Sequence, residues 1–165
     1  MWCNSNNLTS LNVQGLVNLE YLNCKGNSLT SLNVQGLNNL KTLWCSSNNL
    51  TSLNVQGLNN LKLLDCSYNS LTSLNVQGLN NLGRLVCNNN NLTSLNVQGL
   101  NNLHTLWCGG NNFTTLDVSH LPNISFINNN NYASRPIRTI YATGAKEFSY
   151  GTWTEGGKTY PEIIR

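Results

Sequence analysis

One nine-residue block, Leu-Thr-Ser-Leu-Asn-Val-Gln-Gly-Leu, constrains the fold of this 165-residue chain more than any other feature. It occurs five times without change, and successive copies begin 21 residues apart, at Leu8, Leu29, Leu50, Leu71 and Leu92. A sixth, altered copy occupies residues 113–121. A fixed period of roughly 20 to 50 residues is typical of solenoids, in which similar coils stack on one another. We therefore expect a stack of coils over most of the chain.

A cysteine and an asparagine recur with the same period. The cysteines are Cys3, Cys24, Cys45, Cys66, Cys87 and Cys108. Three residues after them come Asn6, Asn27, Asn48, Asn69, Asn90 and Asn111. Written from Leu19, one repeat is Leu19-x-x-Leu22-x-Cys24-x-x-Asn27-x-Leu29, which matches the leucine-rich-repeat signature with Cys in place of one Leu.

This pattern resembles the short bacterial leucine-rich repeats of the internalin-like kind, in the 21-residue variety whose cysteine ladder replaces one aliphatic column. The resemblance covers about residues 1–131. It implies a right-handed leucine-rich-repeat solenoid in which the recurring Asn forms a hydrogen-bonded ladder along the array. It also implies a bacterial surface or secreted setting and a protein ligand, with a host as one source of that ligand.

Side-chain alternation gives a compatible architecture. Leu22 and Cys24 are two residues apart, so in a strand they share one face while Tyr21, Asn23 and Lys25 share the other. One such repeat cannot bury its apolar face alone, so repeats must stack and build a parallel sheet on the concave face. The second half of each repeat is too short for a helix, so we expect short strands or extended turns on the convex side and little α-helix. Seven strands are expected near Trp2, Asn23, Trp44, Asp65, Val86, Trp107 and Asn128.

The cysteine column could indicate disulfides, a metal site or simple packing. Stacked neighbours in a parallel sheet point the same way, with Cβ atoms further apart than the roughly 3.8 Å of a disulfide. Metal ligands converge from several directions, whereas this column offers one sulfur per rung. We therefore expect no metal and no cofactor, and thiols that are free, buried and slow to react as small apolar side chains.

The convex block places polar side chains outward in regular rows. One row consists of Thr30, Thr51, Thr72 and Thr93, and a second of Asn33, Asn54, Asn75 and Asn96. Regular Thr rows on flat solenoids occur in ice-binding proteins, but Thr-Ser is also an ordinary solvated turn. The turn is the preferred interpretation.

Composition argues against several classes of function. Charged residues are 9% of the chain and the net charge of +3 is not clustered, so a nucleic-acid partner is not expected. No run of 18 apolar residues occurs, so no membrane span is expected, and the start of this chain has no signal-peptide pattern. His104 and His120 are the two histidines, and the six carboxylates are scattered. We therefore expect no enzyme activity.

The outward positions of the concave strands vary while the frame stays fixed. The candidate ligand-binding residues are Tyr21, Asn23, Trp44, Leu63, Asp65, Arg84, Val86, Trp107 and Phe126. Aromatic and aliphatic side chains pointing at solvent in one patch are typical of protein interfaces, and Trp44 and Trp107 are the strongest candidates. Asp65 and Arg84 are expected to form a surface ion pair across two strands. The alternative is that these positions vary by drift.

The two ends of the chain differ from the array. Residues 1–131 are expected to form the array and residues 132–165 a C-terminal cap, with a strand over 138–142. Segments 146–154 and 158–164 flank Glu155-Gly156-Gly157, a hairpin signal. At the start, an open strand edge and an apolar layer around Leu8, Leu11 and Leu16 indicate either a fragment, which we prefer, or pairing with another molecule. A monomer or weak self-association through this edge is expected.

The sequence thus favours a non-catalytic binding module that recognises a protein ligand on the concave sheet face. Two alternatives remain open. The array could be a structural spacer with no ligand of its own, or it could bind glycans through exposed Trp side chains.

Overall fold

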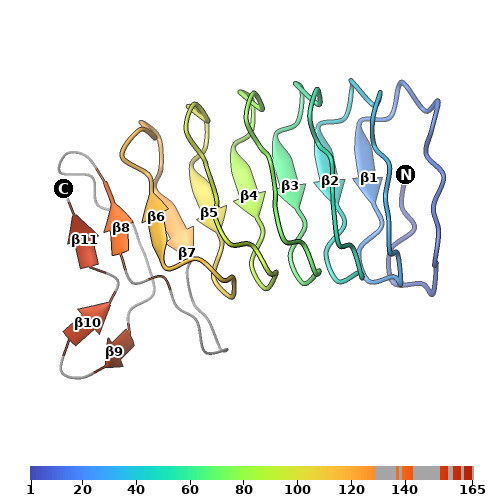
Figure 1. The fold of residues 1–165 in the computed structure, drawn as a ribbon. Coiled ribbons are helices and arrows are strands. Elements are labelled where there is room, and N and C mark those ends of the chain that lie inside the picture. Colours follow the sequence, from blue (N-terminus) through green and yellow to red (C-terminus); the bar gives the residue numbers. More distant parts are fainter. Residues whose placement is uncertain (129–136, 138, 143–152, 156–157, 161, 165) are drawn as a thin grey trace.

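The structure is a computed structural model that describes residues 1–128, 137, 139–142, 153–155, 158–160 and 162–164, and it shows a solenoid (Figure 1). Its described residues form short strands and no helix. The strands are β1 (Tyr21–Asn23), β2 (Thr42–Trp44), β3 (Leu63–Asp65), β4 (Arg84–Val86), β5 (Thr105–Trp107), β6 (Thr115–Asp117), β7 (Phe126–Asn128), β8 (Thr139–Tyr141), β9 (Trp153–Glu155), β10 (Lys158–Tyr160) and β11 (Glu162–Ile164). The expected leucine-rich-repeat solenoid with little helix is therefore confirmed.

The main sheet is parallel and its register follows the sequence period. It has six strands in the order β1-β2-β3-β4-β5-β7, and Leu22 pairs with Leu43, one period further along the chain. Trp2 adds a further rung as an isolated bridge to Asn23. All seven expected strand positions are thus occupied, the first by this bridge.

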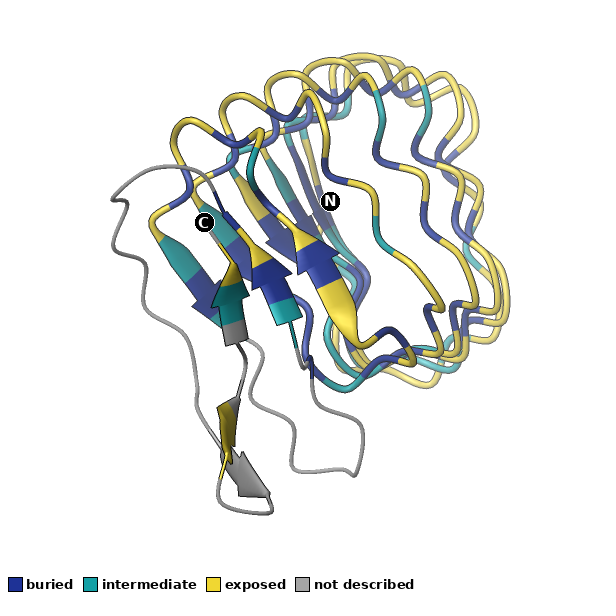
Figure 2. Cartoon of the chain, turned by 60° about the vertical axis from the view of Figure 1, so that its left-hand side comes forward, coloured by how far each residue is buried: buried dark blue, intermediate teal, exposed yellow. Residues whose placement is uncertain are grey.

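The other side of each coil consists of extended segments and turns. Figure 2 shows the sheet along one side of the coil and these segments along the other, with buried residues on both. The convex-side strand among the described residues is β6, which pairs in parallel with β8, while β8 pairs in parallel with β11. Short strands and extended turns were expected here.

The tail contains the expected strands in an arrangement that differs in part. The strand expected over 138–142 is β8, and β9 pairs with β10 in the antiparallel manner of a hairpin. The segment 158–164, expected to flank the hairpin turn, contains two strands, β10 and β11, that belong to different sheets. Pro161 stands between them and has no N–H to donate to a ladder. Residues 146–152, the Gly156-Gly157 turn and the boundary at 131 lie outside the described residues.

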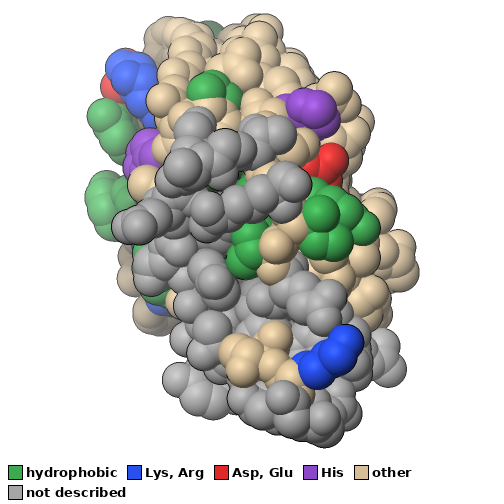
Figure 3. Space-filling view, turned by 90° about the vertical axis from the view of Figure 1, so that its left-hand side faces the viewer, with side chains coloured by type: hydrophobic (Ala, Val, Ile, Leu, Met, Phe, Trp, Pro, Cys, Tyr) green, Lys and Arg blue, Asp and Glu red, His purple; other side chains and the backbone are tan. Residues whose placement is uncertain are grey.

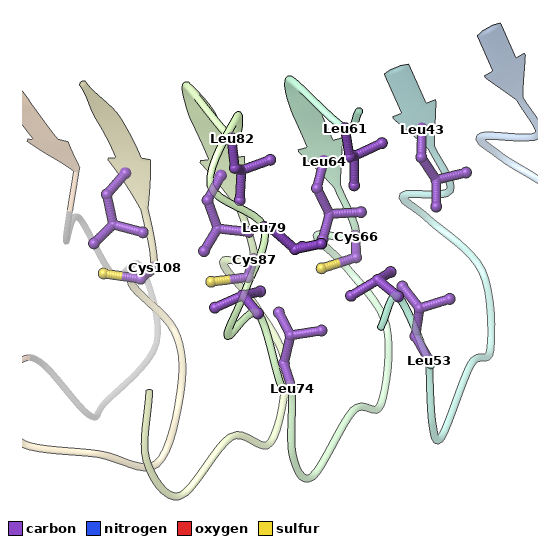
Figure 4. Packing of buried hydrophobic residues seen from close by; sticks show 14 of the residues in the cluster. Leu43, Leu53, Leu61, Leu64, Cys66, Leu74, Leu79, Leu82, Cys87 and Cys108 are labelled. Atoms are coloured by element: carbon purple, nitrogen blue, oxygen red, sulfur yellow. The ribbon is translucent and has the colours of Figure 1, made fainter. Parts of the chain in front are cut away.

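One continuous apolar core runs along the array. The leucines on the inner faces of β1 to β5 are fully buried, as are five cysteines, and Cys3 is half-buried. Figure 4 shows the side chains of Cys66, Cys87 and Cys108 among leucines. All six thiols are free, which confirms the cysteine column as a small apolar column. Burial raises the pKa of Cys24 and of Cys108 to about 12.

The asparagine ladder is formed as the resemblance implied. Asn48 Oδ1 accepts the N–H of Leu29 in the preceding coil at 3.0 Å. Its Nδ2 donates to the carbonyls of Cys24 and Cys45, both at 3.1 Å. Each such side chain therefore ties two coils together at a buried turn. Asn6, in the first coil, is exposed, and its side chain bonds only within its own coil, to the carbonyls of Cys3 and Asn4.

Two further ladders run along the outside of the coils, and neither was expected from the sequence. Gln35 Nε2 donates to the carbonyl of Asn54 in the following coil at 2.9 Å, and Gln14, Gln56 and Gln77 do the same. Asn60 Nδ2 donates back to the carbonyl of Asn38 at 2.9 Å, with equivalents at Asn39, Asn81, Asn102 and Asn123. The expected Thr and Asn rows are exposed.

The two ends of the solenoid present different surfaces. The first coil exposes Met1, Trp2, Leu16, Val17 and Tyr21. At the C-terminal end, Figure 3 shows few charged side chains on the described surface and hydrophobic side chains among polar ones. No helix among the described residues is long and apolar enough to cross a membrane.

Candidate functional site

A groove of about 440 Å³ lies across strands β2 to β5. It is on the solvent-facing side of the main sheet, opposite the side that packs against the leucine core. It is lined by Lys25, Trp44, Ser46, Ser47, Leu63, Asp65, Ser67, Tyr68, Arg84, Val86, Asn88 and Trp107. Three positions of each repeat supply most of this lining. These are the two outward residues of the strand and the residue after the cysteine, so the alternation of the strands positions the groove.

Asp65 is the organising polar residue of the groove. Its Oδ2 accepts the hydroxyl of Ser46 at 3.0 Å, and its Oδ1 accepts the hydroxyl of Ser67 at 2.6 Å and the backbone N–H of Ser67 at 3.1 Å. Both serines are buried. The carboxylate is therefore held in one orientation, and much of its hydrogen-bonding capacity is satisfied within the chain.

Arg84 is exposed, and it lies against an aromatic ring instead of the carboxylate. Its guanidinium carbon is 5.3 Å from the centroid of the Trp107 ring, which is a cation–π arrangement. No ion pair joins Arg84 to Asp65 in the described part of the chain. The expected surface ion pair is therefore wrong. The serines occupy Asp65, and the large Trp107 ring on the next strand offers the guanidinium a flat partner.

Tyr68 enters the groove from a turn that sequence reasoning did not include. It follows the serine after Cys66, has a φ of 52° and leaves 58% of its surface exposed. The same left-handed position is held in other coils by Ser5, Gly26, Ser47, Asn89 and Gly110. All other members of this column are Ser, Gly or Asn, and a left-handed backbone costs most residues about 1 to 2 kcal/mol. A tyrosine in such a column was therefore the signal that could have identified Tyr68.

Replacing Tyr68 with Gly should therefore raise the free energy of unfolding by about 1 kcal/mol, because glycine adopts a positive φ without strain. The exposed phenol ring gives up little buried surface in return. Urea denaturation of Tyr68→Gly against the parent chain measures the change. Ser70→Gly is the matched control: Ser70 is exposed and its φ is not positive, so this change should lower stability. Equal effects of the two substitutions would contradict the assignment of strain.

The structure brings together six of the nine residues that the sequence nominated. Trp44, Leu63, Asp65, Arg84, Val86 and Trp107 all line the groove. Tyr21 and Asn23 in β1 and Phe126 in β7 belong to the same outward rows but lie outside it. The Phe126 ring is 6.3 Å from that of Trp107, so it extends the aromatic surface toward β7.

Val86 was expected to point at solvent and is instead buried, with 6% of its surface exposed. Its register partners are Asp65 on one side and Trp107 on the other. Rungs are about 4.8 Å apart, so the large indole next to a short β-branched side chain shields it from water. Val86 therefore forms part of the groove floor.

Two buried side-chain atoms in the described residues have no hydrogen-bond partner, and both belong to groove residues. They are Nε1 of Trp107 and Oδ1 of Asn88. A buried polar atom without a partner costs about 1 to 3 kcal/mol. Such atoms concentrated in one groove are typical of a surface that another molecule or ordered water completes.

The described residues offer no cluster of three or more His, Cys, Asp or Glu that could hold a metal ion.

A smaller group of polar side chains lies on the convex side. Ser119 donates its hydroxyl to Asp117 Oδ1 at 2.6 Å, and His120 Nε2 is 3.9 Å from Asp117 Oδ2. The bonds from Ser119 hold the pKa of Asp117 below its ordinary value. These three side chains do not line the groove.

Comparison with solved structures finds the same architecture in bacterial proteins. The functional domain of InlJ from Listeria monocytogenes, which includes a cysteine ladder, aligns with a TM-score of 0.71 and 34% identity over 73% of this chain and 27% of its own. An internalin from the same species, InlF, gives 0.68 and 25% over 75% and 38%. YopM from Yersinia enterocolitica gives 0.62 and 25% over 81% and 30%.

The chain spans about a quarter to two fifths of the length of these three structures. No protein-family model matches the sequence, and no curated protein matches it. Leucine-rich-repeat solenoids present an extended face that serves interactions with other proteins. The chain is thus a leucine-rich-repeat protein of the bacterial, internalin-like kind, built from 21-residue repeats with a cysteine ladder.

Proposed function

We propose that this chain is a non-catalytic binding module that recognises a protein ligand through the groove between Trp44 and Trp107. The observation that carries the proposal is the groove itself. It combines two Trp, one Tyr and one Arg with an apolar floor of Leu63 and Val86. Trp, Tyr and Arg are the side chains most enriched at the energetic centres of protein interfaces.

The setting and the tail belong to the same proposal. The likeness to internalins supports a bacterial surface or secreted location, and a ligand of host origin fits that setting. The tail from residue 132 acts as a cap on the array. Ile137, Ile140 and Ala142 support this role, because they are buried in the same core cluster as the leucines of the repeats.

The Trp44→Ala/Trp107→Ala double variant should lose the ligand and keep its fold, because both rings are partly exposed and lie outside the main core. The immobilised chain is incubated with host-cell surface proteins and with glycans, and retention is compared with that of the double variant. Removing two aromatic anchors should lower affinity by at least about a hundredfold. Tyr141→Ala is the control, since Tyr141 is an exposed aromatic outside the groove.

The other outcomes separate the alternatives. A partner that both chains retain would place the interaction on the convex face or the tail. No retention by either chain would favour a structural spacer. Displacement of the ligand by simple sugars would indicate glycan binding. Circular dichroism of each variant shows whether the solenoid is intact.

A further inference from the structure

We infer that the groove takes an acidic, extended segment of a protein partner, with a carboxylate of that segment bound by Arg84 and apolar side chains seated against Trp44 and Trp107. The inference rests on the proposed function and adds the chemistry of the partner to it. It follows from three properties of the groove: its unpaired cations, its hydrogen-bonding groups and its length.

The cations of the groove have no acidic partner. Lys25 and Arg84 both line it, and neither forms an ion pair in the described part of the chain, whereas Lys41 on the rim of the sheet pairs with Glu20 at 2.8 Å. Stacking on Trp107 fixes the Arg84 guanidinium while its edge can still donate two parallel hydrogen bonds. A carboxylate is the group that accepts such a pair.

The carboxylate of Asp65 offsets one of these charges, which leaves the groove with a net charge of +1. Its oxygens accept three hydrogen bonds from Ser46 and Ser67. Asp65 therefore offers little to a ligand, although its charge weakens the attraction for an acidic one. Removing the Asp65 charge should therefore strengthen binding of an acidic segment.

The charged groups of the groove that remain open to a ligand, Lys25 and Arg84, are donors only. Ser47 and Tyr68 add hydroxyls that both donate and accept, whereas the unpartnered atoms of Trp107 and Asn88 are buried. A neutral sugar presents hydroxyls that both donate and accept, and it would use a free carboxylate in the site. The serines already occupy that carboxylate. The groove therefore matches a ligand rich in acceptors, such as a peptide with Asp or Glu side chains.

The spacing of the two indoles sets the length of the segment. Trp44 and Trp107 occupy the same outward row three rungs apart, on β2 and β5, which is a separation of about 14 Å. An extended peptide covers that distance in about four residues. Leu63 and Val86 form the apolar floor between them. A segment with apolar side chains at its ends and carboxylates between them fits this arrangement.

The test uses three fluorescent peptides with Phe at both ends and three central residues that are all Glu, all Gln or all Lys, so that the two Phe side chains are about 14 Å apart and share one face of an extended chain. Fluorescence anisotropy should show that the Glu peptide binds about tenfold more tightly than the Gln peptide, and that salt reduces this preference. Arg84→Gln should abolish the preference and Asp65→Asn should increase it. Lys62→Gln, which removes an exposed cation outside the groove, should leave it unchanged.

Several results would overturn the inference. These are no binding of the Glu peptide at millimolar concentration, equal binding of the Glu and Gln peptides, or the same loss in Lys62→Gln as in Arg84→Gln. A galacturonate oligosaccharide that displaces the peptide and depends more strongly on Arg84 would assign the carboxylate to a glycan. If the peptides fail while a captured protein is still lost by Trp44→Ala/Trp107→Ala, the proposed function stands and only its acidic chemistry is wrong.

Discussion

Raising the pH above about 9 should destabilise this array progressively, and near pH 11 it should unfold. Buried thiols are the cause, because burial raises the pKa of Cys24 and Cys108 to about 12 and holds the pKa values of Cys45, Cys66 and Cys87 well above their ordinary value. In the unfolded chain these thiols ionise near the ordinary value of 9.0. Above that pH the unfolded state binds fewer protons than the folded one, so stability falls as pH rises.

The size of this effect is comparable to the total stability of a domain. One pH unit between the two pKa values weakens folding by about 1.4 kcal/mol for each thiol. At roughly pH 11, Cys24 and Cys108 alone should cost about 5 kcal/mol, and the other three act in the same direction. A typical domain has about 5 to 15 kcal/mol in total. Circular dichroism and thiolate absorbance, measured in reductant across the pH range, should therefore change together.

The control for alkaline unfolding is the Cys24→Ala/Cys108→Ala variant. Its stability at neutral pH will be lower because cavities form, so the quantity compared is the slope of stability against pH. That slope should be smaller than in the parent chain, because two of the buried thiols are absent. Titration of the unfolded parent should count six free thiols. Identical slopes would show that the cysteines do not control alkaline unfolding.

Replacing Asn48 with Ala should lower the free energy of unfolding by about 3 to 5 kcal/mol. The side chain is buried and serves one N–H and two carbonyls in two coils, at Leu29, Cys24 and Cys45. Alanine leaves these groups inside the protein without partners, and each unsatisfied group costs about 1 to 3 kcal/mol. Urea denaturation followed by circular dichroism measures the loss.

Asn6→Ala is the matched control for Asn48→Ala, because it makes the same change in the same column. Asn6 is exposed and its side chain bonds only to carbonyls of its own coil, where water can replace it. Its loss should cost less than about 1 kcal/mol. Equal losses of free energy of unfolding in the two variants would show that hydrogen bonds between coils are not the main contribution of the buried asparagines.

The repeating part of the fold could be predicted because period and side-chain alternation determine it together. The spacing of Leu22 and Cys24 gives the inward face, and the 21-residue interval gives the register in which Leu22 pairs with Leu43. The buried thiols follow from the same argument. In the tail the repeat ends, and pairing depends on contacts between distant segments. That β8 would pair with β6 and β11 was therefore not evident from residues 138–142 alone.

The groove could be predicted in outline. Alternation identifies Trp44, Asp65 and Trp107 as outward residues, but it does not show which neighbour each side chain chooses. Arg84 stacks on Trp107, and the serines hold Asp65, because these partners satisfy shape and hydrogen bonding together. Tyr68 was missed because it lies in a turn beyond the strand, where alternation does not apply.

The glutamine and asparagine ladders on the outside of the coils have a consequence for how the array can change its size. Gln35 bonds forward to the next coil and Asn60 bonds back to the previous one. The Gln is the same in each unchanged copy of the block, and the Asn recurs two residues after each copy. A duplicated coil inserted in the middle would find every donor and acceptor already in place. The protein can therefore grow or shrink by whole coils, each about 4.8 Å thick, with no compensating mutation.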